Sequence, residues 1–307
     1  MATLPAISVE ASEDKPIIVC TTEVLGSIAR EYLGDEADVV VLVNPSLCPA
    51  DFDMKPSNVY AIRNARVLFK QNIPGEFWLE GLLEASGNQN LTQVAIPGVY
   101  NTPEGAKRYT DWIGGNLSEV LGIDLSTEKE EMLEDIDEVQ QWMNDQAQDY
   151  DTSSVKVICM KWQKVFVESA GFQVVATFNP PETLSASDIN DLVNTAESED
   201  VALIVDNLQI DVEFGKGIAD QVGAEHVVLT NFPGAIPGTS SISEMFRYNA
   251  DQLYKATNTW RYTASLKDEK KALENQISLY QISTALAAVI ASVEAVLLYT
   301  WRRRHES

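Results

Sequence analysis

The stretch 17–43 reads IIVCTTEVLGSIAREYLGDEADVVVLV and holds two apolar runs on either side of a helical pattern. Ile17–Cys20 is rich in β-branched residues, and Ala37–Val43 is apolar apart from one aspartate, which is typical of a buried parallel strand. Thr21 and Thr22 are candidate caps for the helix between the two runs. A strand, a helix and a second strand in this order predict a parallel α/β sheet.

The same alternation recurs along most of the chain. Further strands are predicted at Val67–Phe69, Leu91–Ile96, Val155–Met160, Gln173–Phe178, Ala202–Val205 and His226–Leu229. Further helices are predicted at Glu76–Ala85, Thr102–Leu121, Gln163–Ala170, Ser185–Thr195 and Ser240–Thr257. The candidate N-caps are Ser57, Ser185 and Ser187, and the candidate C-cap is Gly122.

One acidic segment, Thr127–Gln148, separates two sets of strands. Its apolar residues recur at helical spacing and predict a long helix with one buried face: Met132, Ile136, Val139 and Met143. We therefore predict an α/β protein of two lobes joined by a long helix, with a ligand cleft between them and a C-terminal transmembrane helix. The expected divisions are a flexible N-terminus (1–15), the first lobe (16–125), the inter-lobe helix (126–150), the second lobe (151–260), a stalk (261–276), the anchor (277–301) and a cytoplasmic tail (302–307).

Composition narrows the classes of function. The 307 residues include 46 Asp and Glu against 22 Lys and Arg, which gives a formal net charge of −24. This balance argues against nucleic acid as a partner, because phosphate neutralisation needs a surplus of basic residues. Hydrophobic residues make up 45%, so the chain has enough apolar surface to form a core. With 2 His and 3 Cys, neither a His-rich metal site nor a disulfide scaffold is expected.

The C-terminal region resembles a membrane anchor. Residues 277–293 carry no charge, and Arg302–Arg304 follow Tyr299 and Trp301. A span needs about 20 apolar residues, and interfacial aromatics before an arginine cluster are typical of a cytoplasmic helix end. We expect a single C-terminal anchor in the cell membrane, with the main body outside the cell. A buried or self-associating helix stays open as an alternative, because Glu294 interrupts the apolar run.

Four segments together resemble the zinc/manganese-type solute-binding proteins of ABC importers. Val43–Asn58, VNPSLCPADFDMKPSN, resembles the first ligand loop of that family, and Ile96–Pro103, IPGVYNTP, resembles the second. Glu76–Leu83, EFWLEGLL, resembles the Glu-x-Trp-Leu helix, and Ser241–Thr257 resembles the closing helix of the fold. The resemblance runs from about residue 17 to 257 and implies two α/β lobes with a metal site between them.

The residues that bind metal in that family are mostly absent from this chain. The resemblance places Ala50, Gly98 and Met160 where the family has its first, second and third histidine ligands. It keeps a carboxylate as Asp206, and it places the last aspartate position at Thr230 or Asn231. We therefore expect this protein to carry a cargo different from the zinc or manganese ion that the usual site of the family binds.

Sulfur-bearing residues suggest one replacement for that site. Thiolate and thioether donors favour soft ions such as Cu(I), and thiolates also bind zinc. The candidate metal ligands are Cys48, Cys159, Met160 and Asp206, with Cys20 as a further cleft residue. The alternative is that Cys20 and Cys159 are core residues, because free cysteine is among the most buried residue types. A third alternative is a disulfide between two of the cysteines, because disulfides persist in exported proteins.

A non-metal ligand or a metal chelate is the second option for the cleft. An aromatic ring, a cation and an amide could hold an organic anion or a chelate. The candidate residues are Asp51, Tyr100, Asn101, Lys161, Trp162 and Asn231.

Enzyme motifs are missing from the strand-to-helix junctions, since no Gly-x-Ser-x-Gly, P-loop or Gly-x-Gly-x-x-Gly occurs there. His226 opens an apolar run and is interpreted as structural. The sequence thus predicts a non-enzymatic, membrane-anchored solute-binding protein with an ABC permease and its ATPase as partners. The alternative is a surface receptor or structural module that kept the fold and lost metal binding.

Overall fold

A computed structural model describes residues 15–305 of the chain. It divides into two compact units, the first ending at Thr257 and the second beginning at Asn258. The flexible N-terminus expected at 1–15 lies, except for Lys15, outside the described residues.

Lobe one of the first unit is built on a sheet of four parallel strands in the order β2-β1-β3-β4. Its strands are β1 (Ile17–Cys20), β2 (Asp38–Val41), β3 (Ala65–Lys70) and β4 (Thr92–Ala95). Its helices are α1 (Glu23–Leu33), α2 (Pro56–Asn64), α3 (Leu79–Ser86) and α4 (Pro103–Leu121), with short 3-10 helices η1 (Pro49–Asp51) and η2 (Pro74–Glu76). The two inner strands, β1 and β3, carry most of the buried apolar residues, as expected for a sheet covered on both faces.

Lobe two repeats this plan with a parallel sheet in the order β6-β5-β7-β8. Its strands are β5 (Lys156–Met160), β6 (Gln173–Phe178), β7 (Leu203–Asn207) and β8 (Glu225–Leu229). Its helices are α6 (Lys164–Ser169), α7 (Ala186–Ser198) and α8 (Glu213–Val222), with 3-10 helices η3 (Thr152–Ser154), η4 (Lys161–Gln163) and η5 (Pro181–Thr183). The two-lobe α/β fold class predicted from the sequence is confirmed. Helix α8 was not predicted.

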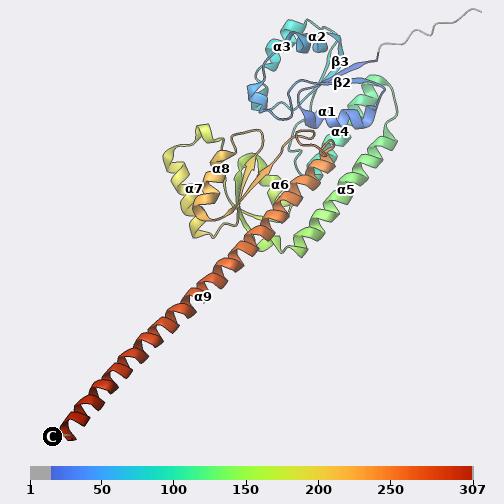
Figure 1. The fold of residues 1–307 in the computed structure, drawn as a ribbon. Coiled ribbons are helices and arrows are strands. Elements are labelled where there is room, and N and C mark those ends of the chain that lie inside the picture. The colour runs from blue at the N-terminus through green and yellow to red at the C-terminus, as the bar shows by residue number, and fades with distance from the viewer. Residues whose placement is uncertain (1–14, 306–307) are drawn as a thin grey trace, which may run out of the picture. The chain divides into compact units, whose positions relative to one another are not determined.

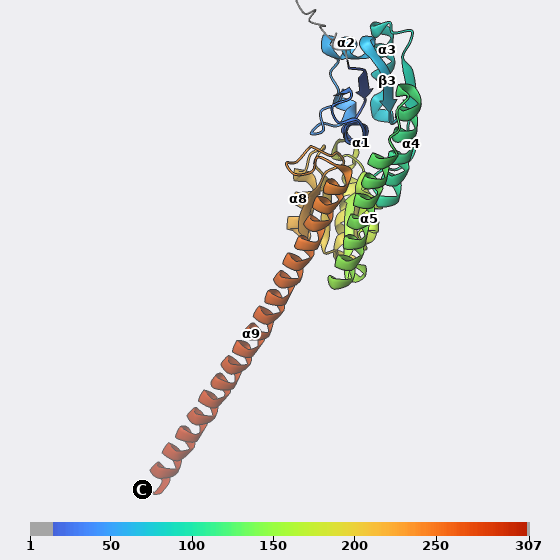
Figure 2. The ribbon, with the colours of Figure 1, turned by 90° about the vertical axis from the view of Figure 1, so that its right-hand side faces the viewer.

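The helix α5 (Ser126–Asp149) connects the two lobes, as Figures 1 and 2 show. Its buried face consists of the predicted residues Met132, Ile136, Val139 and Met143. The first turns of α9 (Ile242–His305) belong to the same unit and pack on α5. Tyr254 Oη donates a hydrogen bond to the carbonyl of Met143 at 3.0 Å, and the Arg247 guanidinium lies 4.5 Å from the centre of the Trp142 ring.

Two helix caps follow the sequence prediction. Ser185 accepts a hydrogen bond from the Asp188 amide at the start of α7, and Gly122 ends α4 with a φ of 71°. A positive φ is costly for residues with a Cβ, so glycine suits this left-handed position. Thr102 also caps α4 by accepting a hydrogen bond from the Gly105 amide.

Two other predicted caps make no capping hydrogen bond. Thr22 stands at the N-cap of α1 but makes no capping bond, because its hydroxyl donates to Gln71 Oε1 at 2.7 Å. Ser57 lies inside the first turn of α2, which begins at Pro56, so Lys55 is the N-cap residue. The Lys55 amide donates to Asn58 Oδ1 at 2.8 Å and closes this helix start instead.

The second unit, taken by itself, consists of the later part of α9. Residues 258–305, including the expected stalk and anchor, are helical. This helix is long and apolar enough to cross a membrane by length and composition, and the apolar window is not buried against other described residues.

Candidate ligand-binding interface between the lobes

Loops from the carboxyl ends of both sheets meet at one interface. Tyr100 Oη donates a hydrogen bond to the Asn231 carbonyl at 3.0 Å, and Asn101 Nδ2 donates to the Trp162 carbonyl at 2.8 Å. Gln209 Nε2 donates in the opposite direction, to the Pro45 carbonyl of lobe one, at 2.8 Å. We call these residues the inter-lobe interface: Pro45, Tyr100 and Asn101 from lobe one, and Trp162, Gln209 and Asn231 from lobe two.

The loop between β4 and α4 is held by aromatic residues. Tyr109 Oη of α4 donates to the carbonyls of Ile96 at 3.3 Å and Gly98 at 2.9 Å. Its ring lies 5.7 Å from that of Tyr100, so the interface tyrosine packs on a ring that is itself fixed. Burial raises the pKa of both phenols, which keeps them neutral and able to donate.

The loop that contains η1 is held by the helix segment with the Glu-x-Trp pattern. Trp78 Nε1 donates to the Pro49 carbonyl at 2.9 Å, and the Trp78 ring centre lies 4.0 Å from that of Phe52. Both contacts join residues far apart in sequence, and they hold the η1 loop against the start of α3.

Glu76 in that pattern is a buried carboxylate with a full set of donors. It accepts hydrogen bonds from the Thr21 hydroxyl and from the main-chain amides of Gln71 at 3.3 Å, Asn72 at 2.7 Å and Ile73 at 3.3 Å. A buried charge is tolerated when it is hydrogen-bonded in this way. Glu76 therefore fixes the carboxyl end of β3 next to β1.

Lobe two meets the interface through a polar network at the ends of β7 and β8. Gln209 Oε1 accepts from the Asn231 amide at 3.2 Å, and Gln209 Nε2 also donates to Thr230 Oγ1 at 3.0 Å. Asn249 of α9 holds Thr230 by two bonds to its main chain, at 3.0 and 2.8 Å. The first turns of α9 thus support the same loops.

Two buried amide atoms in this network have no hydrogen-bond partner among the described residues. They are the donor Asn207 Nδ2 and the acceptor Asn231 Oδ1. Their residues are only 1% and 8% exposed, and Asn207 ends β7 while Asn231 lies just after the neighbouring β8. Because a buried polar group without a partner is destabilising, one free donor and one free acceptor mark a place where a ligand or water would bind favourably.

The sulfur-bearing candidates are mostly core residues. Cys20 and Cys159 are fully buried, and burial raises the pKa of each thiol to about 12, which opposes the thiolate that a metal requires. Met160 is 1% exposed and packs in the lobe-two core, where we expected a cleft-facing thioether. Cys48 is half-buried, and burial raises its pKa as well. All three cysteines are free, so no disulfide joins them.

Asp206 is likewise engaged inside lobe two. It is 2% exposed, and His226 Nε2 lies 2.7 Å from its Oδ2, which agrees with a structural role for His226. Burial raises the pKa of Asp206, and the bond to His226 opposes that shift. Within residues 15–305, no three His, Cys, Asp or Glu side chains form a group that could hold a metal ion. The predicted metal ligands are therefore not brought together.

The remaining predicted cleft residues differ in exposure. Asp51 and Lys161 are exposed, and the Trp162 side chain is 43% exposed although its carbonyl takes part in the interface. Gln209 and Pro45 were not predicted. A polar residue three positions beyond Asp206, past the end of a buried strand, is the signal that would have identified Gln209.

Comparison with known proteins agrees with this architecture. Residues 18–256 match the family described as ZnuA, zinc-uptake complex component A, periplasmic. The chain is 21% identical over 257 residues to the manganese-binding lipoprotein MntA of Halalkalibacterium halodurans, covering 76% of this chain and 86% of that protein.

Solved structures show the same fold. The Mn-bound periplasmic metal-binding protein of Candidatus Liberibacter asiaticus superposes with a TM-score of 0.68 at 14% identity, covering 79% of this chain and all (100%) of that chain. A crystal structure of ZnuA gives a TM-score of 0.67 at 19% identity, covering 80% of this chain and 100% of that chain. With its matched segments in both lobes, the chain belongs to the ZnuA family of periplasmic zinc-uptake components.

Proposed function

We propose that this protein is a membrane-anchored, extracellular solute-binding protein of an ABC importer, and that its inter-lobe interface captures a metal in the form of a chelate. The observation that supports the chelate is the pair of unpartnered amide atoms, Asn207 Nδ2 and Asn231 Oδ1. A chelate carries hydrogen-bonding groups of its own, which these atoms would bind, whereas a bare ion needs several charged or thiolate ligands. Membership of a metal-uptake family supports a metal as part of the cargo.

The bare soft ion is the competing cargo. Its donors would be Cys48, Cys159, Met160 and Asp206, bound to Cu(I) or zinc. Binding would require Cys159 and Met160 to leave the core of lobe two, because both are at most 1% exposed. The chelate would need the loops around Asn207 and Asn231 to open, because these residues are 1% and 8% exposed, but it would not need β5 to give up two core side chains.

Elemental analysis and thermal unfolding of the full chain, purified anaerobically in detergent, test this proposal. We expect citrate or histidine complexes of zinc, manganese or copper to raise the unfolding temperature more than the free ions do. Asn207→Ala and Asn231→Ala should reduce the shift, and Cys48→Ser should leave it unchanged. A shift with Cu(I) alone that Cys48→Ser abolishes would establish the soft-ion site instead.

The membrane anchor is proposed from the composition of α9 and from the arginine cluster that ends it. An anchored protein of this kind would deliver its solute to a permease in the same membrane, powered by an ATPase. Protease treatment of intact cells tests the topology. The acidic body should be digested from outside, while an epitope placed after Arg304 should be protected.

One observation favours a second function, a surface receptor or structural module without transport. Three hydrogen bonds join protein groups of the two lobes directly, as a module that holds its lobes together would require. A module of this kind would show no thermal shift with any metal or chelate and no association with a permease. The same thermal series therefore separates the two functions.

A further inference from the structure

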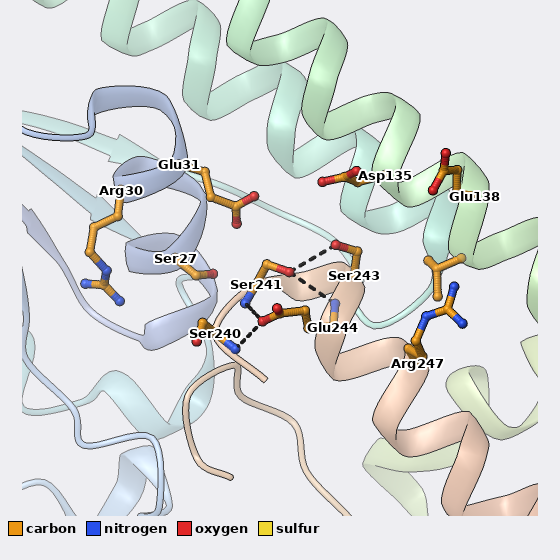
Figure 3. A pocket seen from close by; sticks show the side chains of 11 residues that line it. Ser27, Arg30, Glu31, Asp135, Glu138, Ser240, Ser241, Ser243, Glu244 and Arg247 are labelled. Atoms are coloured by element: carbon orange, nitrogen blue, oxygen red, sulfur yellow. Dashed lines mark hydrogen bonds between the residues drawn. The ribbon is translucent and has the colours of Figure 1, made fainter. Parts of the chain in front are cut away.

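A polar pocket of about 540 Å³ lies where α1, α5 and the start of α9 meet (Figure 3). It shares no residue with the inter-lobe interface, and its walls come from lobe one, from the connecting helix and from the helix that supports lobe two. The charged residues that line it are Arg30, Glu31, Asp135, Glu138, Glu244 and Arg247. We call it the three-helix junction.

Carboxylates reach this junction from all three helices. Glu31 comes from α1, Asp135 and Glu138 from α5, and Glu244 from α9, and Figure 3 shows the Glu31 and Asp135 carboxylates directed toward each other. Glu244 Oε2 accepts from the amides of Ser240 at 2.7 Å and Ser241 at 3.1 Å, so it caps α9. Glu31 differs from Glu244 because no donor satisfies its carboxylate in the same way: its Oε1 is buried without a hydrogen-bond partner among the described residues.

The two arginines in the junction have other contacts. Arg30 forms an ion pair with Glu23, and Arg247 stacks over the Trp142 ring at 4.5 Å. Arg30 still favours the ionised form of Glu31, but Asp135 and Glu244 each oppose it more strongly.

Other elements that pack against α1 add little charge at this place. In α4, Lys107 pairs with Asp137 and Asp111 pairs with Lys129. Strand β1 has no charged residue, and β2 has only an aspartate at its first position. Burial, and then the charges of Asp135 and Glu244, raise the pKa of Glu31 to about 7, although Arg30 acts against them.

We propose that the three-helix junction makes the arrangement of the lobes sensitive to pH: a protonated Glu31 lets α1 pack against α5 and α9, and an ionised Glu31 repels their carboxylates. The device is independent of the solute in the inter-lobe interface, since no cargo takes part. It would couple the lobe arrangement to pH near neutrality.

The sign of the effect follows from linkage. The pKa of Glu31 is raised from 4.5 to about 7 in the folded protein, so its stabilising contribution is complete below 4.5 and is lost as pH rises through about 7. Wild type should therefore unfold at a lower temperature at about pH 8.5 than at about pH 5.5, on either side of that pKa. Glu31→Gln, which is neutral at every pH, should lose this part of the dependence.

Distances between spin labels measure the arrangement of the lobes directly. Labels at Tyr60→Cys in lobe one and Asn194→Cys in lobe two, both exposed sites, would be placed in the full chain with Cys48→Ser. We expect the inter-lobe distance distribution to broaden at about pH 8.5 relative to about pH 5.5, and Glu31→Gln to keep the narrow distribution at both.

Glu138→Gln is the matched control, since Asp135 and Glu244 are the carboxylates that act on Glu31. It should respond to pH as wild type does. A wild-type distribution that does not change between the two pH values, or a Glu31→Gln variant that changes as wild type does, would overturn the proposal.

Discussion

Lobe one contains two glutamates in opposite surroundings, the buried Glu76 and the partly buried Glu31. Glu76, at the carboxyl end of β3, accepts four hydrogen bonds from a threonine hydroxyl and three main-chain amides. Glu31, on α1, has a buried oxygen without a partner, and nearby carboxylates help to raise its pKa to about 7. The surroundings of the two carboxylates thus differ: hydrogen-bond donors surround Glu76, whereas nearby carboxylates oppose the ionised form of Glu31.

Asp206 in lobe two lies between these extremes. It is almost fully buried, and its carboxylate bonds with the His226 ring and the Gly215 amide. The burial that raises its pKa is offset in part by these bonds. The three carboxylates therefore form a series, from four hydrogen bonds on Glu76, through two on Asp206, to a Glu31 oxygen with no partner among the described residues.

Removing the fully bonded carboxylate should have the largest effect on stability. Glu76→Ala leaves several buried donors without an acceptor, so we expect the free energy of unfolding to fall by about 3 kcal/mol, measured by denaturant unfolding of the full chain. Glu80→Ala, at an exposed position of α3, is the control and should change it little. Equal effects of the two substitutions would show that Glu76 is not held as described.

The partly bonded carboxylate can be disturbed without changing its charge. A Cβ on Gly215 would lie 2.1 Å from Asp206 Oδ2, so Gly215→Ala should destabilise the protein by about 2 kcal/mol through overpacking. Gly217→Ala lies two positions along α8 with nothing within 4 Å of the new Cβ, and should instead stabilise the helix by about 0.5–1 kcal/mol. Denaturant unfolding of the two variants should therefore show changes of opposite sign in the free energy of unfolding. Destabilisation by both substitutions would contradict the packing of α8 on Asp206.

Neutral contacts between the lobes should have a smaller effect that does not depend on pH. Asn101→Ala and Gln209→Ala each remove a side-chain donor to a carbonyl of the other lobe, which is worth about 1 kcal/mol. Both should broaden the inter-lobe distance distribution equally at low and high pH. Asn64→Ala, whose bond is within α2, should leave that distribution unchanged.

The sequence allowed accurate prediction where the deciding contacts are local or periodic. Helix α5 was predicted because four apolar residues repeat at helical spacing, and Ser185 was predicted as a cap because its partner is three residues away. Thr22 occupies the predicted N-cap position, but its hydroxyl makes no capping bond because its partner, Gln71, lies 49 positions along the chain. Helix α8 was missed because two glycines weaken its pattern within ten residues.

For the site, the family resemblance predicted Tyr100, Asn101 and Asn231 as cleft residues, but it could not show which residues of the other lobe they contact. Position near a strand end also could not reveal the direction of a side chain. Alternation along β5 sends Met160 into the same core as Ile158, so a residue at a former ligand position became a packing residue. Such directions depend on the register of the whole sheet.

Calorimetric titration of the full chain compares the two cargoes most directly. Wild type, Asn231→Ala and Cys48→Ser would each be titrated with zinc–citrate, with free Zn²⁺ and, anaerobically, with Cu(I). Binding at the inter-lobe interface predicts that wild type and Cys48→Ser bind the chelate with the same affinity and that Asn231→Ala binds it at least about tenfold more weakly, a loss of about 1.4 kcal/mol. Binding of free ions alone, weakened by Cys48→Ser and unaffected by Asn231→Ala, would contradict it.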